Sequence, residues 1–142
     1  MKNFFFIISG ILLLIGVLFL TPVCAVCGCV ICNYEPVLES IPANDFFELA
    51  DSENFVLIDI RTIEEYNSGK IAGATNLDFY SSSFESELDL LDKDKTYLIY
   101  CRSGSRSSQA LKTMQSLGFM EVYDLKGGII AWQNSDFPVI FS

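Results

Sequence analysis

The stretch TYLIYCRSGSRSSQALKTMQSLG, residues 96–118, joins two periodic segments through a short polar loop. Residues 96–100 form a compact apolar run, which is typical of a strand buried on both faces of a sheet. Residues 107–117 place apolar side chains at helical spacing, and Gly118 follows where a helix commonly ends. The sequence therefore predicts a strand over 96–100, a loop that begins at Cys101, and a helix over 107–117.

The segments on both sides continue this alternation of strand and helix. Strands are expected over 55–60, 72–77 and 121–125, and helices over 41–49, 84–91 and 129–133, the last after the Gly127-Gly128 turn. Thr62 and Glu65 form a capping-box pattern, which predicts a further helix that stops near Ser68-Gly69. The alternation predicts an α/β domain with a mainly parallel sheet.

In such sheets, ligands bind beyond the carboxyl ends of the strands. Asp59, Arg61 and Cys101 all fall at such ends. These three residues are therefore expected near one site.

The first part of the chain differs in composition from this domain. Lys2 precedes an uncharged apolar run over 4–20, a length between the ~7–15 residues of a signal peptide and the ~20 of a spanning helix. We therefore divide the chain into a leader over 1–28, a linker over 29–39 and a domain over 40–142. The leader has three interpretations: a cleaved signal peptide, an uncleaved membrane anchor, or a lipoprotein signal with Cys29 as the lipidated residue.

Each interpretation gives the same expected location. The domain would lie outside the cytoplasm, in a periplasm or at a cell surface, either secreted or attached to the membrane through its N-terminal segment. Lys2, as the only charge before the apolar run, favours a cytoplasmic N-terminus.

Four of the five cysteines cluster at the end of the apolar run. Cys24, Cys27, Cys29 and Cys32 have the spacing C-x2-C-x-C-x2-C, which could ligate a metal as thiolates. Cleavage at Cys29 would remove two of these ligands, so small apolar residues or lipid attachment points are the favoured interpretation. No metal and no cofactor are predicted. Cys32 could act as a resolving thiol only if the linker reaches the site.

The composition excludes several classes of function. The 142 residues carry 18 acidic and 9 basic side chains, and the net charge of −9 argues against a nucleic-acid partner. The chain has no histidine, which excludes Cys-His proteases, Ser-His-Asp hydrolases and His-ligated catalytic zinc. Any nucleophile must therefore be activated by local electrostatics.

The loop after residue 100 suits such activation. A strand followed by a Gly- and Ser-rich loop and a helix N-terminus forms an anion site, because free backbone N–H groups converge there. A cysteine in that position is stabilised as a thiolate. Cys101 is the predicted nucleophile, and the predicted substrate-binding residues are Arg102, Ser103, Gly104, Ser105 and Arg106. The hydroxyl of Ser107 is a further candidate donor.

The loop over 101–107 resembles the active-site loop of rhodanese-type sulfurtransferases. The segments 57–61, 64–66, 69–76 and 125–132 are also similar to motifs of that family, in the same order. Where the family often has a histidine, this chain has Lys70, so a positive charge is kept but titration near neutral pH is lost. The resemblance covers about 40–139, nearly the whole predicted domain.

The resemblance implies a three-layer α/β/α fold and a two-step reaction. The Cys101 thiolate would take a sulfane sulfur from a small anionic donor such as thiosulfate, and a thiophilic acceptor, cyanide or a thiol, would remove it from the persulfide. A protein thiol is a further candidate acceptor. The family pattern suggests that Asp59 and Arg61 brace the site, although a purely structural ion pair explains them as well.

Two other functions remain open on the sequence. A rhodanese-like sensor or binding module without catalysis would be expected to have lost Cys101, which this chain retains. A Cys-dependent phosphatase or arsenate reductase uses a similar loop, but its signature has five residues between cysteine and arginine, whereas four separate Cys101 from Arg106. The shorter loop suits a sulfur atom better than a phosphate.

Overall fold

The computed structural model describes residues 35–51 and 54–141. The leader over 1–28, the start of the linker and Cys24, Cys27, Cys29 and Cys32 lie outside the described residues. Among the described residues, no helix is both long enough and apolar enough to cross a membrane.

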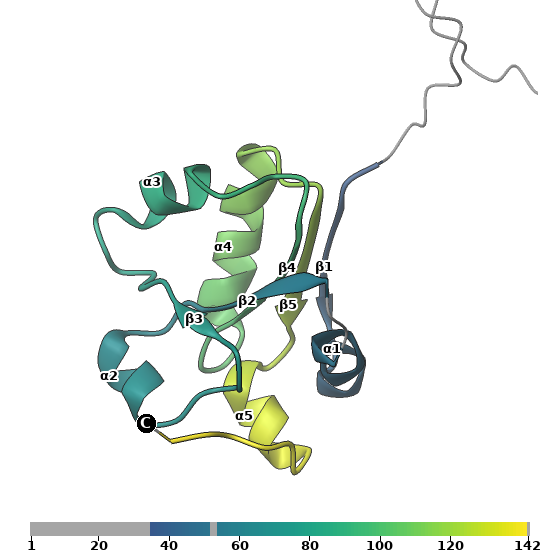
Figure 1. Cartoon of the computed structure of the whole chain (residues 1–142), viewed down its shortest axis with the longest axis vertical. Coiled ribbons are helices and arrows are strands. Elements are labelled where there is room, and N and C mark those ends of the chain that lie inside the picture. The colour runs from purple at the N-terminus through teal and green to yellow at the C-terminus, as the bar shows by residue number, and fades with distance from the viewer. Residues whose placement is uncertain (1–34, 52–53, 142) are drawn as a thin grey trace, which may run out of the picture. The chain divides into compact units, whose positions relative to one another are not determined.

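The domain is built on one five-stranded sheet in which every strand pair is parallel (Figure 1). The strand order is β1-β5-β4-β2-β3. The strands are β1 (Val37–Ile41), β2 (Phe55–Asp59), β3 (Thr75–Asn76), β4 (Thr96–Tyr100) and β5 (Glu121–Leu125). The helices are α1 (Ala43–Ala50), α2 (Ile63–Asn67), α3 (Phe84–Asp89), α4 (Ser105–Ser116) and α5 (Gly128–Asn134). The predicted α/β class and mainly parallel sheet are confirmed.

Alternate side chains of the central strands enter two separate cores. In β4, Leu98 and Tyr100 pack against α1 and α5, whereas Tyr97 and Ile99 pack against α3 and α4 on the other face. All four side chains are almost completely buried, as expected for a strand with helices on both faces. The domain therefore has the predicted three layers, helix, sheet and helix.

The first strand corrects the predicted linker. The sequence pattern predicts a linker up to residue 39 and a helix from Ile41, but residues 37–41 form the edge strand β1, and α1 starts after Pro42. β1 is half-exposed and carries only a weak apolar alternation. Its backbone pairs with β5, from Val37 opposite Glu121 to Ile41 opposite Leu125. This pairing stabilises a strand that the sequence of 37–41 does not indicate by itself.

The sheet brings three loops to one edge. Asp59 of β2 lies opposite Tyr100 of β4, and Ile99 of β4 lies opposite Asp124 of β5, so these strands end at nearly the same level. The loops that follow them begin at Ile60, Cys101 and Lys126. The predicted capping box is present, and it starts α2 beside this edge.

Candidate active site

Cys101 follows β4 directly and precedes a tight loop that leads into α4. The helix begins at Ser105, two residues earlier than its apolar pattern predicts, so Ser105 and Arg106 belong to its first turn. Gly104 is the N-cap with φ of +90°, a left-handed conformation that only glycine adopts readily. This conformation lets the chain turn from strand to helix around the cysteine sulfur.

The sulfur of Cys101 is enclosed by hydrogen-bond donors. The backbone N–H of Gly104 donates to Sγ at 3.1 Å, and the hydroxyl of Ser107 donates to it at 3.5 Å. Only 1% of the residue is exposed. Burial raises the pKa of the Cys101 thiol, but the Ser107 hydroxyl and the backbone N–H groups of Ser107, Ser103 and Arg106 outweigh it and hold that pKa below its ordinary value. Hydrogen bonds to the charged form explain the direction.

A second helix holds the same loop from behind. The N–H groups of Ile129 and Ile130, in the first turn of α5, donate to the carbonyl oxygens of Cys101 at 2.9 Å and of Arg102 at 3.2 Å. Gly128 makes this approach feasible, since a Cβ atom there would lie 2.5 Å from the Cys101 carbonyl oxygen. The sequence predicts the Gly127-Gly128 turn but not this contact between the turn and the loop.

The two arginines of the loop lie in different environments. Arg106 forms a two-pronged ion pair with Glu65, at 2.7 Å from Nη1 to Oε2 and 2.8 Å from Nη2 to Oε1. The Arg106 guanidinium also lies 5.4 Å from the centre of the Tyr80 ring. The Glu65 pair raises the pKa of Arg106, and Arg106 lowers the pKa of Glu65. The sequence indicates Glu65 only as a helix cap, so its part in the site was missed.

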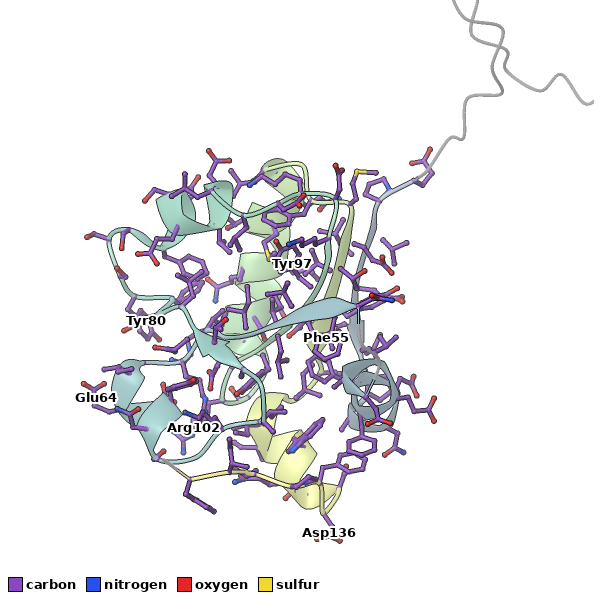
Figure 2. All side chains as sticks on the ribbon, viewed as in Figure 1. Phe55, Glu64, Tyr80, Tyr97, Arg102 and Asp136 are labelled. Carbon is purple, nitrogen blue, oxygen red and sulfur yellow. The ribbon has the colours of Figure 1, made fainter. Side chains whose placement is uncertain are left out.

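Arg102 is exposed and borders a cavity beside the loop. Figure 2 shows Arg102, Glu64 and Tyr80 toward the same side of the domain. The cavity has a volume of about 270 Å³, and its lining residues are Arg61, Glu65, Ser68, Gly69, Arg102, Ile129, Ile130 and Gln133. Its walls thus combine two arginines, one glutamate and two isoleucines.

The predicted serines divide into two groups. Ser103 and Ser105 are exposed, and Ser103 contributes to the sulfur through its backbone N–H. Ser107 is fully buried, and its hydroxyl is the one that faces Sγ. The structure therefore brings Gly104 and Ser107 to the sulfur and leaves the hydroxyls of Ser103 and Ser105 at the surface.

Asp59 and Arg61 form a buried ion pair behind the cavity. The Arg61 Nε donates to both carboxylate oxygens of Asp59, at 2.9 and 3.0 Å, and both side chains are at most 5% exposed. Arg61 Nη2 also donates to the carbonyl oxygen of Gly69 at 2.7 Å. The pair thus ties the end of β2 to the Gly69 wall of the cavity.

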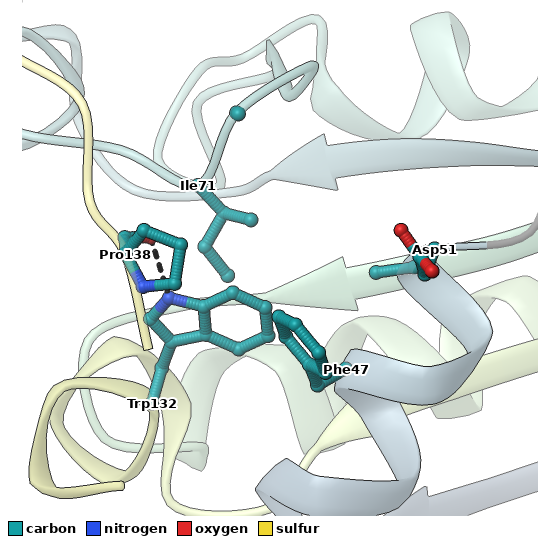
Figure 3. A pocket seen from close by; sticks show the side chains of 7 residues that line it. Phe47, Asp51, Ile71, Trp132 and Pro138 are labelled. Carbon is teal, nitrogen blue, oxygen red and sulfur yellow. Dashed lines mark hydrogen bonds between the residues drawn. The ribbon is translucent and has the colours of Figure 1, made fainter. Parts of the chain in front are cut away.

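A second cavity lies on another side of α5. It has a volume of about 120 Å³ and is mainly apolar, with Phe47, Ile71 and Trp132 in its wall (Figure 3). The indole of Trp132 donates to the Pro138 carbonyl oxygen at 2.9 Å, the dashed line in the figure. None of the predicted site residues lines this cavity, so we place the chemistry at Cys101.

Comparison with known proteins agrees with this fold. Residues 43–135 match the model of the rhodanese-like domain. A sulfurtransferase of Allochromatium vinosum is 39% identical over 92 residues, which cover 65% of this chain and 84% of that protein. The thiosulfate sulfurtransferase GlpE of Glaesserella parasuis is 29% identical, over 74% of this chain and 95% of that protein. The crystal structure of a rhodanese-related protein from Thermoplasma volcanium superposes with a TM-score of 0.65 at 30% identity, covering 73% of this chain and 99% of that one.

Proposed function

We propose that this chain, which belongs to the rhodanese-like domain family, is a sulfurtransferase that carries a sulfane sulfur on Cys101. The observation that supports this most is the enclosure of the Cys101 sulfur. It is buried, it receives hydrogen bonds from Gly104 and Ser107, and its pKa is lowered without a histidine. An enclosure of this kind stabilises a negative charge on sulfur, both as thiolate and as persulfide.

The reaction has two displacement steps on sulfur. With thiosulfate as donor, the Cys101 thiolate attacks the outer sulfur, the S–S bond breaks, and sulfite leaves with the bonding electrons. The enzyme then holds Cys101–S–S⁻, and we expect the donors that face Sγ to help stabilise its charge. An acceptor thiolate or cyanide attacks the terminal sulfur and restores the Cys101 thiolate. Because the thiolate forms without a general base, the enclosure does the work that a histidine does elsewhere.

The cavity beside the loop gives the donor its approach. Arg102 is exposed at this cavity and supplies a positive charge for an anionic donor. Cyanide, a small thiol or a protein thiol can serve as acceptor, since the second step requires only a nucleophile that reaches the terminal sulfur. A non-catalytic binding role would need neither the Cys101 thiol nor the donors that face its sulfur.

Intact mass spectrometry tests the sulfurtransferase proposal. We expect the full chain to gain the mass of one sulfur atom on incubation with thiosulfate, to lose it on addition of cyanide, and to gain nothing as the Cys101→Ser variant. Peptide mapping separates Cys101 from Cys24, Cys27, Cys29 and Cys32. A protein that takes up no sulfur from any sulfane donor would contradict the proposal.

We further propose that residues 1–28 export the domain or anchor it to a membrane. The uncharged run over 4–20 supports this location, and so does the resemblance of Val26-Cys27-Gly28-Cys29 to a bacterial lipobox, with Gly28 before the cysteine that would be lipidated. The mass of the mature N-terminus, measured on protein from a native membrane fraction, distinguishes the three processing states. A cleaved chain, a lipidated Cys29 and an intact Met1 each give a different mass, and an unprocessed chain in the soluble cytoplasmic fraction would refute the proposed location.

A further inference from the structure

Three arginines lie at or beside the cavity, and two of them are neutralised. Arg61 is paired with Asp59, and Arg106 is paired with Glu65. Among the described residues, the Arg102 side chain forms no salt bridge. Within that part of the chain, the mouth of the site therefore presents one positive charge without an ionic partner, although its sequence suggests three.

Glu65 is the residue that reduces this charge. Its two carboxylate oxygens bind the two terminal nitrogens of Arg106, and the side chain itself borders the cavity. Arg106 follows the loop within the first turn of α4, close to the Cys101 sulfur. A dianion that enters the cavity thus meets the attraction of Arg102, while the charge of Arg106 is offset by Glu65.

We propose that Glu65 is a specificity-determining residue, which reduces the advantage that sulfur donors with two negative charges have over donors with one. This inference rests on the proposed sulfurtransferase function and names its donor class. The donors that gain from Glu65 relative to the thiosulfate dianion are organic monoanions, such as thiosulfonates and persulfides. Ile130 lines the cavity and is exposed, so its side chain can supply apolar contact for the organic group.

The transfer from such a donor balances in the same way as the transfer from thiosulfate. The Cys101 thiolate attacks the terminal sulfur of R–SO₂–S⁻, the S–S bond breaks, and the sulfinate R–SO₂⁻ leaves with the bonding electrons. The total charge is unchanged, and no external oxidant or reductant takes part. The two donors therefore differ at the site mainly in charge and in their organic group.

The Glu65→Gln variant separates the charge of Glu65 from its structural role. Glu65→Gln removes the charge but keeps an oxygen that can accept the Thr62 N–H, because glutamine also completes a capping box. Glu64→Gln is the matched control, since it removes the same charge from the neighbouring, exposed residue (Figure 2). Thr62→Ala is the reverse control, because it breaks the capping box and leaves the charge.

The first measurement compares two donors of different charge. We expect Glu65→Gln to raise the ratio of kcat/KM for thiosulfate to kcat/KM for methanethiosulfonate by about three- to tenfold at low salt, as one unit charge at short range implies. The ratio should stay within about twofold in Glu64→Gln and Thr62→Ala. An unchanged or lower ratio in Glu65→Gln would overturn the inference.

The second measurement does not depend on sulfur transfer. Iodoacetate and iodoacetamide alkylate the same thiolate but differ by one negative charge, so the ratio of their rates reports the potential at Cys101. Alkylation of Cys101 in the full chain is followed by peptide mapping. Glu65→Gln should raise the iodoacetate-to-iodoacetamide ratio by about three- to tenfold, and Glu64→Gln should not.

The two measurements distinguish the two proposals. If no variant transfers sulfur but the alkylation ratio rises in Glu65→Gln, the sulfurtransferase function fails and the charge role of Glu65 stands. If sulfur is transferred and neither ratio responds, the function stands and the inference about Glu65 fails.

Discussion

Replacement of Gly128 by alanine tests how closely α5 approaches the catalytic loop. Gly128 has φ of +61°, and a Cβ atom there would lie 2.5 Å from the Cys101 carbonyl oxygen and 2.6 Å from the Arg102 carbonyl carbon and oxygen. All three neighbours are backbone atoms, so no side-chain rotation relieves the clash. The loop or the helix start must move.

The expected cost has two parts. An alanine in the left-handed region costs roughly 1–2 kcal/mol. Displacing packed atoms around an inserted methyl group typically costs a further ~1–3 kcal/mol. We therefore expect Gly128→Ala to lower the free energy of unfolding by about 2–5 kcal/mol. A shift of the loop should also weaken the hydrogen bonds to the Cys101 sulfur, so sulfur loading by thiosulfate should slow by about a hundredfold.

Gly118→Ala provides the matched control for this experiment. Gly118 also has a positive φ, of +85°, but a Cβ atom there would meet nothing within 4 Å. Its alanine variant should lose only the conformational part, roughly 1–2 kcal/mol, and should load sulfur at the rate of the parent chain. Urea denaturation and the time course of intact mass measure the two quantities. Equal stability of the two variants, with equal loading rates, would refute the close approach described above.

Three further outcomes are expected. Ser107→Ala should move the pH midpoint of Cys101 alkylation upward, because the Ser107 hydroxyl is the largest of the contributions that oppose burial and lower this pKa; an unchanged midpoint would contradict its role. In the parent chain, the rate of sulfur loading should stay high below the ordinary thiol pKa of ~8.5 and fall only as the pH drops through the lowered pKa of Cys101. An inflection of the rate–pH curve at or above ~8.5 would contradict the lowered pKa. Asp59→Ala should reduce the free energy of unfolding by about 3–5 kcal/mol, because Arg61 becomes a buried charge without its partner, and an unshifted urea midpoint would count against that pair.

The parts of the fold that the sequence predicts are those with a strong local signal. β2, β4 and β5 are buried central strands, and their apolar runs show it without any tertiary information. β1 was missed because an edge strand is half-exposed and depends on its neighbour β5. β3 has only two residues, shorter than the predicted 72–77, because its backbone pairs with β2 only at Thr75 and Asn76.

The sequence likewise predicts the parts of the site that are local in the chain and not the parts that depend on long-range contacts. Cys101 and the loop around it are local in sequence, so the order of the residues alone predicts an anion-binding loop. The ion pair between Arg106 and Glu65 spans 41 residues, and the contact of Gly128 with the Cys101 carbonyl depends on how α5 docks against the loop. The capping-box spacing accounts for Glu65 without any contact outside α2, so the sequence gives no indication of its ion pair with Arg106.

The absence of histidine has a mechanistic consequence for the whole site. A general base is one side chain, whereas most donors of this enclosure are backbone N–H groups, whose positions depend on the shape of the loop. The loop is fixed by the hydrogen bond from the Gly104 N–H to the Cys101 sulfur. It is also fixed by the N–H groups at the start of α5, which donate to the carbonyl oxygens of Cys101 and Arg102. Changes that reshape the backbone, such as Gly128→Ala, should therefore damage sulfur loading more than changes of charge at the mouth, such as Glu65→Gln. The conformation of the loop then controls whether Cys101 reacts, and the charge at the mouth of the cavity controls which sulfur donor it reacts with.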